Sequence, residues 1–259
     1  MTGTPTVARR VGEVVDDLTL RGWAVDPVSG REGAAEVVVR DGRIDHVTWL
    51  TGADADDVSA DGLLIAPGFV DLHAHLREPG NEDAETVATG LAAAAHGGFT
   101  TVCAMPNTTP AIDEPGIVAR VRAAAGASGS PVRLLVHGAV TTGRAGETLA
   151  PLGELADAGV VGFSDDGSPV ANGSILRNAL AYAGALGLPI VDHPEDPALT
   201  AGAEASEGDV ATVLGLKGWP VAAEAGAVAR AIANLADVVR DVPAARLHLT
   251  HVSTAAALE

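Results

Sequence analysis

Two histidines at the end of an apolar run are the residues of this chain best placed to do chemistry. His73 and His75 stand at positions i and i+2 of the stretch Gly68-Phe-Val-Asp-Leu-His-Ala-His-Leu-Arg77. Alternate side chains of a strand share one face, so both imidazoles could bind one metal ion from a rigid support. Pro67-Gly68 interrupts the chain before this run, and Arg77-Glu-Pro-Gly80 turns it afterwards. The pair therefore predicts a metal site at the carboxyl end of a buried strand.

Apolar runs that alternate with alanine-rich stretches indicate the elements that position these histidines. From residue 67 onward the pattern is typical of repeated βα units with a parallel sheet. We predict strands at 64–72, 100–104, 132–140, 160–163, 188–192 and 246–250, and helices near 84–95, 117–125, 152–158, 174–186 and 222–239. The spacing favours an α/β fold, an incomplete (β/α)8 TIM-type barrel with its active site at the strand carboxyl ends. A doubly wound open sheet is the alternative, but no Gly-x-Gly-x-x-Gly follows the first strand.

The first part of the chain has a different sequence pattern, with short apolar runs separated by turn residues. Short strands are predicted at 18–20, 23–25, 36–39 and 44–50, with turns at Arg21-Gly22, Ser29-Gly30 and Asp41-Gly42. We therefore expect a small N-terminal β-sandwich domain over residues 1–66 and the barrel over residues 67–259.

Further polar residues stand at the ends of the later predicted strands. They are Asn107, the pair Asp165-Asp166, His193 and His251. In a barrel these positions converge, and four histidines with one carboxylate suit zinc, because a carboxylate can bridge two ions. Each residue has an ordinary alternative: the Asp-Asp-Gly segment could be a plain turn, and either histidine could belong to the core. Only one of two neighbouring aspartates can easily enter the site, because their side chains point to opposite sides.

Composition excludes several classes of protein. The 259 residues include 34 acidic and 16 basic side chains, and the net charge of −18 would repel nucleic acid. The single cysteine, Cys103, rules out an internal disulfide and a thiolate zinc cluster. No run of eighteen apolar residues is present, so we expect a cytoplasmic protein without a membrane partner. His96, His137 and His248 are not predicted as ligands.

Several segments together resemble one known family, the class I dihydroorotases of the amidohydrolase superfamily. The similarity runs from about residue 17 to the last residue and rests on Pro67–Gly80, Gly98–Thr108, Phe163–Gly167, His193–Asp196 and His251–Thr254. The resemblance implies two zinc ions per subunit. His73 and His75 would bind one, Asp166 would bridge both, and His193 and His251 would bind the other.

The resemblance also implies an activity and a pair of substrate-binding residues. The reaction would be the reversible cyclisation of N-carbamoyl-L-aspartate to L-dihydroorotate in pyrimidine biosynthesis, by a metal-bound hydroxide. Arg77 and Asn107 would bind the substrate carboxylate. Arg77 lies two residues beyond His75 and can offer a planar pair of donors, although a surface ion pair with Glu78 or Asp71 is the alternative. For Asn107 the alternative is simple turn formation.

Other outcomes remain open at this point. Hydantoinases and allantoinases commonly bridge their metals with a modified lysine, whereas Asp166 takes that place here. A non-catalytic dihydroorotase-like partner of aspartate transcarbamoylase is a further alternative, and the retained ligands argue against it. The family's general base, an aspartate, would lie beyond residue 259, so we expect an N-terminal fragment that is inactive alone. We also expect a homo-oligomer acting on a small-molecule substrate, with aspartate transcarbamoylase as a partner to consider.

Overall fold

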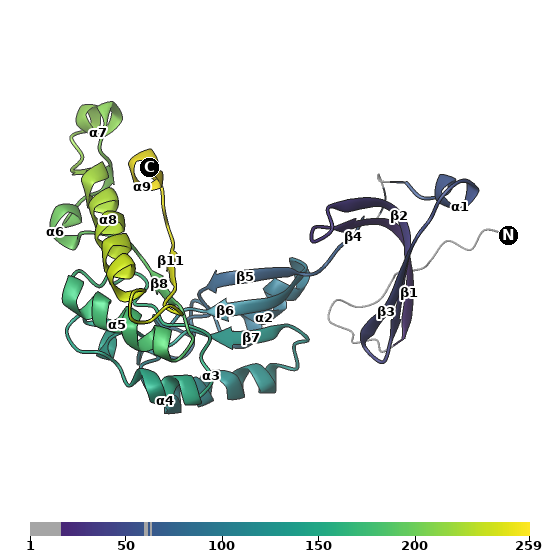
Figure 1. Cartoon of the computed structure of the whole chain (residues 1–259), viewed down its shortest axis with the longest axis horizontal. Coiled ribbons are helices and arrows are strands. Elements are labelled where there is room, and N and C mark those ends of the chain that lie inside the picture. Colours follow the sequence, from purple (N-terminus) through teal and green to yellow (C-terminus); the bar gives the residue numbers. More distant parts are fainter. Residues whose placement is uncertain (1–16, 60–61, 63) are drawn as a thin grey trace. The chain divides into compact units, whose positions relative to one another are not determined.

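The computed structural model describes residues 17–59, 62 and 64–259, which form two compact units (Figure 1). The first unit contains the described residues up to Val70, with Ala92–Thr101 and Ser130–Val132. The second contains Asp71–Leu91, Val102–Gly129 and Arg133–Glu259. Every predicted site residue belongs to the second unit. No helix in the described part of the chain is long and apolar enough to cross a membrane.

The first unit is built on a four-stranded sheet in the order β3-β2-β1-β4. Its elements are β1 (Leu18–Asp26), β2 (Arg31–Arg40), β3 (Arg43–Trp49), α1 (Ala53–Asp56) and β4 (Leu64–Ile65). Asp41 and Gly42 join β2 to β3 with φ values of 51° and 68°, which is the geometry of a tight hairpin turn. The predicted turn at Arg21-Gly22 is wrong, because both residues pair with β2 inside one continuous strand. The described residues form one sheet here, so the sandwich stays a prediction.

The predicted first barrel strand, 64–72, is also wrong as a single element. It is divided into β4 and β5 (Phe69–Ala74), and β4 pairs with β1 instead. Pro67 lacks a backbone donor, and Gly68 packs so closely that a Cβ there would lie 2.0 Å from Thr100 Cγ2. The missing N–H of Pro67 interrupts the strand ladder, and β5 begins after it in a different sheet.

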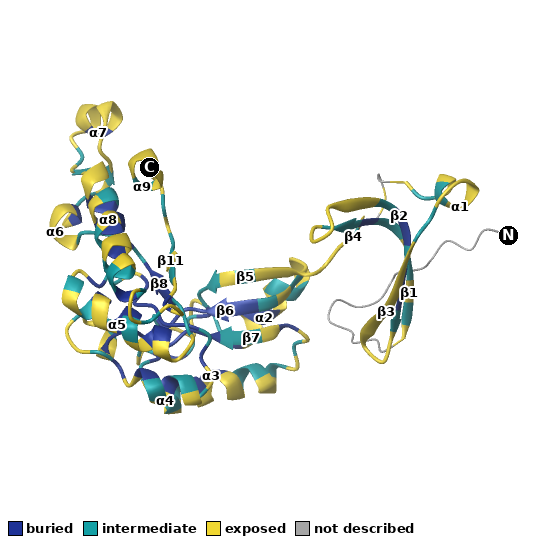
Figure 2. Cartoon of the chain, in the orientation of Figure 1, coloured by how far each residue is buried: buried dark blue, intermediate teal, exposed yellow. Residues whose placement is uncertain are grey.

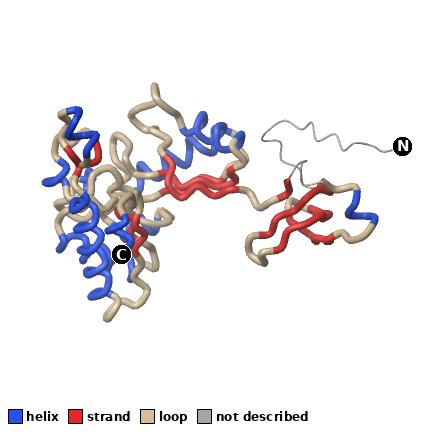
Figure 3. Tube along the Cα trace, turned by 90° about the horizontal axis from the view of Figure 1, so that it is seen from above, coloured by secondary structure: helices blue, strands red, loops and turns tan. Residues whose placement is uncertain are grey.

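In that new sheet, neighbouring strands follow chain order. Figure 3 shows its strands lying side by side. β5 lies beside β6 (Phe99–Ala104), which lies beside β7 (Arg133–Val136). Single bridges then join Gly138 to Phe163 and Phe163 to Ile190, and β8 (Ile190–Asp192) pairs in parallel with β11 (Leu247–Leu249). The predicted strand at 160–163 is thus reduced to bridges of Phe163. This order is what repeated βα units produce.

Helices follow the strands and cover them. The bounds are α2 (Val87–His96), α3 (Pro115–Ser128), α4 (Leu152–Asp157), α5 (Gly173–Ala185), α8 (Val221–Val238) and α9 (Ala255–Leu258), with a 3-10 turn at Thr142–Arg144. Between β8 and α8 the chain adds α6 (Pro197–Thr200), β9 (Ala205–Ser206), α7 (Asp209–Leu214) and β10 (Gly218–Trp219), which the sequence pattern did not predict. Figure 2 shows buried residues along α5, α8 and β8, and α5 contacts both α8 and β8. Phe163, Leu176 and Ile190 are among the largest fully buried side chains.

Candidate metal centre

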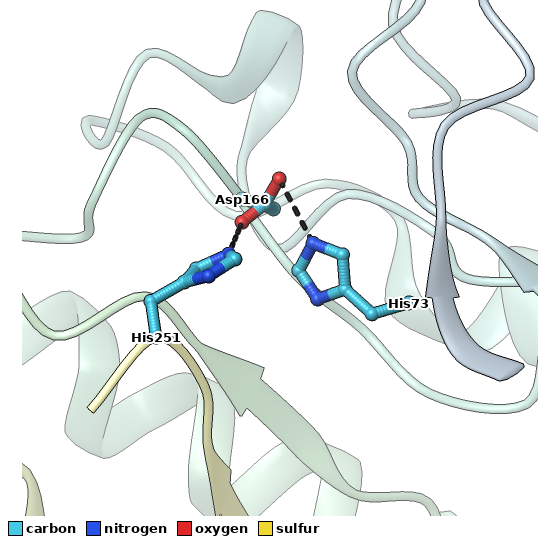
Figure 4. A group of neighbouring side chains, drawn as sticks. All are labelled: His73, Asp166 and His251. Atoms are coloured by element: carbon cyan, nitrogen blue, oxygen red, sulfur yellow. Dashed lines mark hydrogen bonds and ion pairs between the residues drawn. The ribbon is translucent and has the colours of Figure 1, made fainter. Parts of the chain in front are cut away.

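A buried carboxylate surrounded by imidazoles forms the centre of the site (Figure 4). Asp166 is 3% exposed. Its Oδ1 lies 2.9 Å from His251 Nε2 and 3.2 Å from His193 Nδ1. Its Oδ2 lies 3.3 Å from His73 Nε2 and 3.5 Å from His75 Nε2. Each carboxylate oxygen therefore faces a different pair of histidines.

The topology of the sheet explains why these residues meet. His73 is the last residue but one of β5, and His75 follows that strand directly. His193 comes directly after β8, and His251 comes two residues after β11. Parallel strands present their carboxyl ends at one edge, so residues far apart in the chain become neighbours.

His73 has the properties of a metal ligand rather than of a satisfied core histidine. Nδ1 is buried without a hydrogen-bond partner among the described residues, and the equally buried Nε2 lies 3.3 Å from Asp166 Oδ2 without forming a hydrogen bond to it. Burial lowers the pKa of His73, although Asp166 acts in the opposite direction. A neutral imidazole with an unshared lone pair is the form that binds metal ions. Ligand atoms of His73, Asp166 and His251 lie within 4.8 Å of one another, so this group fits a metal ion.

The electrostatics of Asp166 also favour a cation at this place. Burial acts to raise the pKa of Asp166, but hydrogen bonds with His193 and His251 and the nearby His73 outweigh it, so the pKa lies below its usual range. The same contact with Asp166 raises the pKa of His193. The pocket thus holds an ionised carboxylate that stabilises positive charge beside it, which a metal ion would supply.

Asp165 points away from the imidazoles. Its Oδ1 accepts the backbone N–H groups of Val140 at 2.8 Å and Thr141 at 3.1 Å, and Thr141 also donates its hydroxyl to Oδ2. Burial raises the pKa of Asp165. Asp165 therefore holds the neighbouring loop, and Asp166 is the aspartate that faces the histidines.

The amide of Asn107 contacts two of the candidate ligands. Its Nδ2 donates to Asp166 Oδ2 at 3.5 Å, and its Oδ1 lies 2.9 Å from His75 Nδ1. Because an ionised carboxylate only accepts hydrogen bonds, the amide nitrogen must face Asp166. The amide oxygen then accepts a hydrogen bond from the His75 Nδ1–H, which leaves the His75 Nε2 lone pair directed at Asp166.

Arg77 lies in the turn after β5, half-buried and with a φ of 57°. It forms no ion pair within the part of the chain that the structure describes. Glu78, one of its predicted alternative partners, accepts the N–H of Val87, and Asp71, the other, accepts the N–H of His73. The guanidinium is therefore not committed to either acid.

Sequence comparison identifies the family. The Dihydro-orotase-like family model matches residues 62–255. The chain belongs to the dihydroorotase-like family. Among curated relatives, the dihydroorotase of Pelotomaculum thermopropionicum is 45% identical over 235 residues, which cover 90% of this chain and 53% of the relative. The dihydroorotase of Anaeromyxobacter sp. (strain K) is 47% identical over 239 residues, with 92% and 54% covered. The chain spans about half the length of these relatives.

Solved structures show the same kind of mixed α/β fold. The L-hydantoinase (dihydropyrimidinase) from Arthrobacter aurescens superposes with a TM-score of 0.64 at 24% identity, covering 89% of this chain and 51% of that one. The dihydroorotase from Saccharomyces cerevisiae in complex with 5-fluoroorotic acid gives a TM-score of 0.50 at 16% identity, covering 72% and 48%. At these identities the similarity concerns the fold alone.

Two positions of this dihydroorotase-like chain have contacts at the site that the sequence reasoning missed. Arg144 Nη2 donates to the Asp166 carbonyl at 2.6 Å and to Ser168 Oγ at 2.9 Å, which holds the turn that carries the central carboxylate. Glu224 lines a cavity of about 330 Å³ beside His193 and His251. Neither residue stands at a strand end, so spacing alone provided no signal for them.

Proposed function

We propose that the protein is a metal-dependent dihydroorotase, which interconverts N-carbamoyl-L-aspartate and L-dihydroorotate. The observation that carries the proposal is the division of the Asp166 carboxylate between two histidine pairs. A carboxylate that bridges two ions needs one ligand set on each oxygen, and this division matches that need. Family membership and the dihydroorotases at 41–47% identity support the substrate assignment.

The residues suit two zinc ions. His73, His75 and Asp166 would hold one, and His193, His251 and Asp166 would hold the other. Bound zinc would supply Lewis acidity for the substrate carbonyl and would lower the pKa of water at the site. The donor atoms are imidazole nitrogens and carboxylate oxygens, and zinc binds both kinds in proteins.

The chain's own side chains would bind and orient the substrate. Arg77, which has no acidic partner among the described residues, would pair with the substrate carboxylate, and the Asn107 Nδ2 hydrogen that is not directed at Asp166 would donate to it. In the hydrolytic direction, the water oxygen bonds to the ring carbonyl carbon, the ring C–N bond breaks, and the leaving nitrogen takes the proton. A general acid would have to deliver that proton.

The same proposal extends to the architecture. Residues 1–66 would contribute a small β domain, and residues 67–259 would contribute the first strands of a TIM-type barrel. The chain-order neighbours from β5 to β11 support a barrel, because a doubly wound sheet reverses its strand order part-way. A homo-oligomer in the cytoplasm, with or without aspartate transcarbamoylase, belongs to this proposal too.

A direct assay tests the function. The protein as its gene encodes it is loaded with zinc and given dihydroorotate, hydantoin and allantoin in parallel. We expect dihydroorotate to be hydrolysed and chelation to abolish the activity reversibly. Turnover of hydantoin or allantoin without dihydroorotate would replace the proposal with that class of cyclic amidohydrolase. Zinc binding without turnover of any substrate would favour the non-catalytic partner.

A further inference from the structure

A buried glutamate outside the predicted ligand set anchors the segment that carries His251. Glu224 lies in the first turn of α8 and is 8% exposed. The Ser253 N–H reaches both of its carboxylate oxygens at 3.0 Å. Thr254 donates its N–H at 2.8 Å and its hydroxyl at 2.7 Å. Hydrogen bonds to a carboxylate are stronger than those between neutral groups, so this is a firm attachment.

The chain on the other side of His251 is anchored as well. Thr250 donates its N–H at 2.9 Å and its hydroxyl at 3.0 Å to the carbonyl of Asp192. Between the two anchors, His251 has a φ of 55°, in the left-handed region that residues other than glycine rarely occupy. Such a conformation costs free energy and persists only where the surroundings hold it. The two anchors provide that support.

The ring of His251 is only partly enclosed by its neighbours. Its side chain is 43% exposed, its centroid lies 4.6 Å from that of His73 and 4.5 Å from that of His193, and Nε2 lies 2.9 Å from Asp166 Oδ1. The position of the backbone from Thr250 to Thr254 therefore matters for these contacts, because it sets the point from which the imidazole reaches Asp166. On the α8 side, the hydrogen bonds of Glu224 hold that segment in place.

We propose that Glu224 is a positioning residue for His251. Its carboxylate fixes the backbone that aims the imidazole at Asp166, and it thereby sets the affinity of the metal position formed by His251, His193 and Asp166. The inference rests on the proposed metal role of His251. Residues that orient metal ligands typically change metal affinity by about 10–100-fold when they are replaced.

The first test uses the metal-free protein, so that it does not depend on zinc. Glu224→Ala and Glu224→Gln are compared with Asp237→Asn, a control on the same helix that removes a 2.7 Å ion pair with Arg177. We expect Glu224→Ala to speed hydrogen exchange at the Ser253 and Thr254 amides and to shift the imidazole 15N resonances of His251. The control should leave these signals unchanged. Unshifted His251 resonances in both Glu224 variants would overturn the proposal.

The second test is a zinc titration of the same proteins. We expect Glu224→Ala to lower zinc affinity by about 10–100-fold at the position formed by His193, His251 and Asp166. Glu224→Gln should lose less zinc affinity, because its amide oxygen can still accept hydrogen bonds from Ser253 and Thr254. If the alanine variant does not fold, the glutamine variant is used in its place. Faster amide exchange with wild-type zinc affinity would show that Glu224 only ties α8 to the loop, which overturns the proposal. If the wild-type protein bound no zinc, the proposed metal centre would fail, while the His251 resonances would still decide the positioning role.

Discussion

The two contacts of Asn107 can be separated by substitution, because one uses its oxygen and the other its nitrogen. Asn107→Asp retains an oxygen 2.9 Å from His75 Nδ1 but loses the donor and adds a negative charge. Asn107→Ala removes both contacts. A hydrogen bond to a charged group contributes about 1.5–3 kcal/mol, which corresponds to about 10–100-fold in kcat/KM.

We therefore expect the two variants to differ in zinc affinity. Asn107→Asp should bind zinc within about threefold of wild type, since the His75 tautomer is preserved. Asn107→Ala should bind zinc about 10–100-fold more weakly, since nothing then orients His75. Both variants should lose at least about tenfold in kcat/KM for dihydroorotate, and Asn107→Asp should lose more because it also repels the substrate carboxylate.

The assay combines zinc titration with kinetics on fully loaded protein, so that lost metal is not read as lost recognition. Hydantoin, which has no carboxylate, is the control substrate and should be affected little by Asn107→Asp. The reasoning would be refuted if Asn107→Asp lost as much zinc affinity as Asn107→Ala, because the contact with His75 would then have no part in metal binding.

Three further predictions concern other residues of the second unit. Asp166→Ala should lower zinc affinity more than about 100-fold, as removal of a direct ligand exceeds the effect of an orienting partner, and a greater loss in Asp165→Ala would reverse the assignment. Arg77→Ala should lower kcat/KM for dihydroorotate at least about tenfold, and equal losses on hydantoin would count against a carboxylate contact. Burial acts to raise the pKa of Glu224, but the bonds from Thr254 and Ser253 lower it below its ordinary value of 4.5. The unfolded chain then binds the proton more tightly, so Glu224 stabilises the fold above pH 4.5 and this contribution is lost as pH falls below it. Denaturant unfolding of the metal-free wild-type protein should show a free energy of unfolding that falls as pH drops below 4.5, and Glu224→Gln should reduce this dependence on pH. If the two proteins gave parallel plots of unfolding free energy against pH, Glu224 would not be the cause.

Local pattern was enough to predict the candidate ligands. His73 and His75 are two residues apart at the end of an apolar run, and strand geometry alone places them on one side. Asn107, His193 and His251 could be proposed in the same way, because the carboxyl ends of parallel strands meet at one edge. Their role in binding metal and substrate stays a prediction.

Contacts between distant segments decided what the pattern left open. Neighbouring side chains at a strand end point to opposite sides, so the sequence indicated that only one of Asp165 and Asp166 could enter the site. The hydrogen bonds from the backbone of Val140 and Thr141 to Asp165 show that Asp165 is the one that turns away. The run 64–72 looks like one strand, yet β4 pairs with β1, and Pro67, which lacks an N–H, stands between it and β5.

The sequence by itself determined the residue types, their places at strand ends and the alternation of strands and helices, because these depend on local periodicity. Only the tertiary structure decided how the Asp166 oxygens divide between two histidine pairs and which side chains form hydrogen bonds to the segments that carry the candidate ligands. Glu224 and Arg144 stand on a helix and in a 3-10 turn, far in sequence from His251 and Asp166, which they respectively support. Hydrogen bonds of this kind join groups that the fold brings together, and no spacing rule within the chain encodes them.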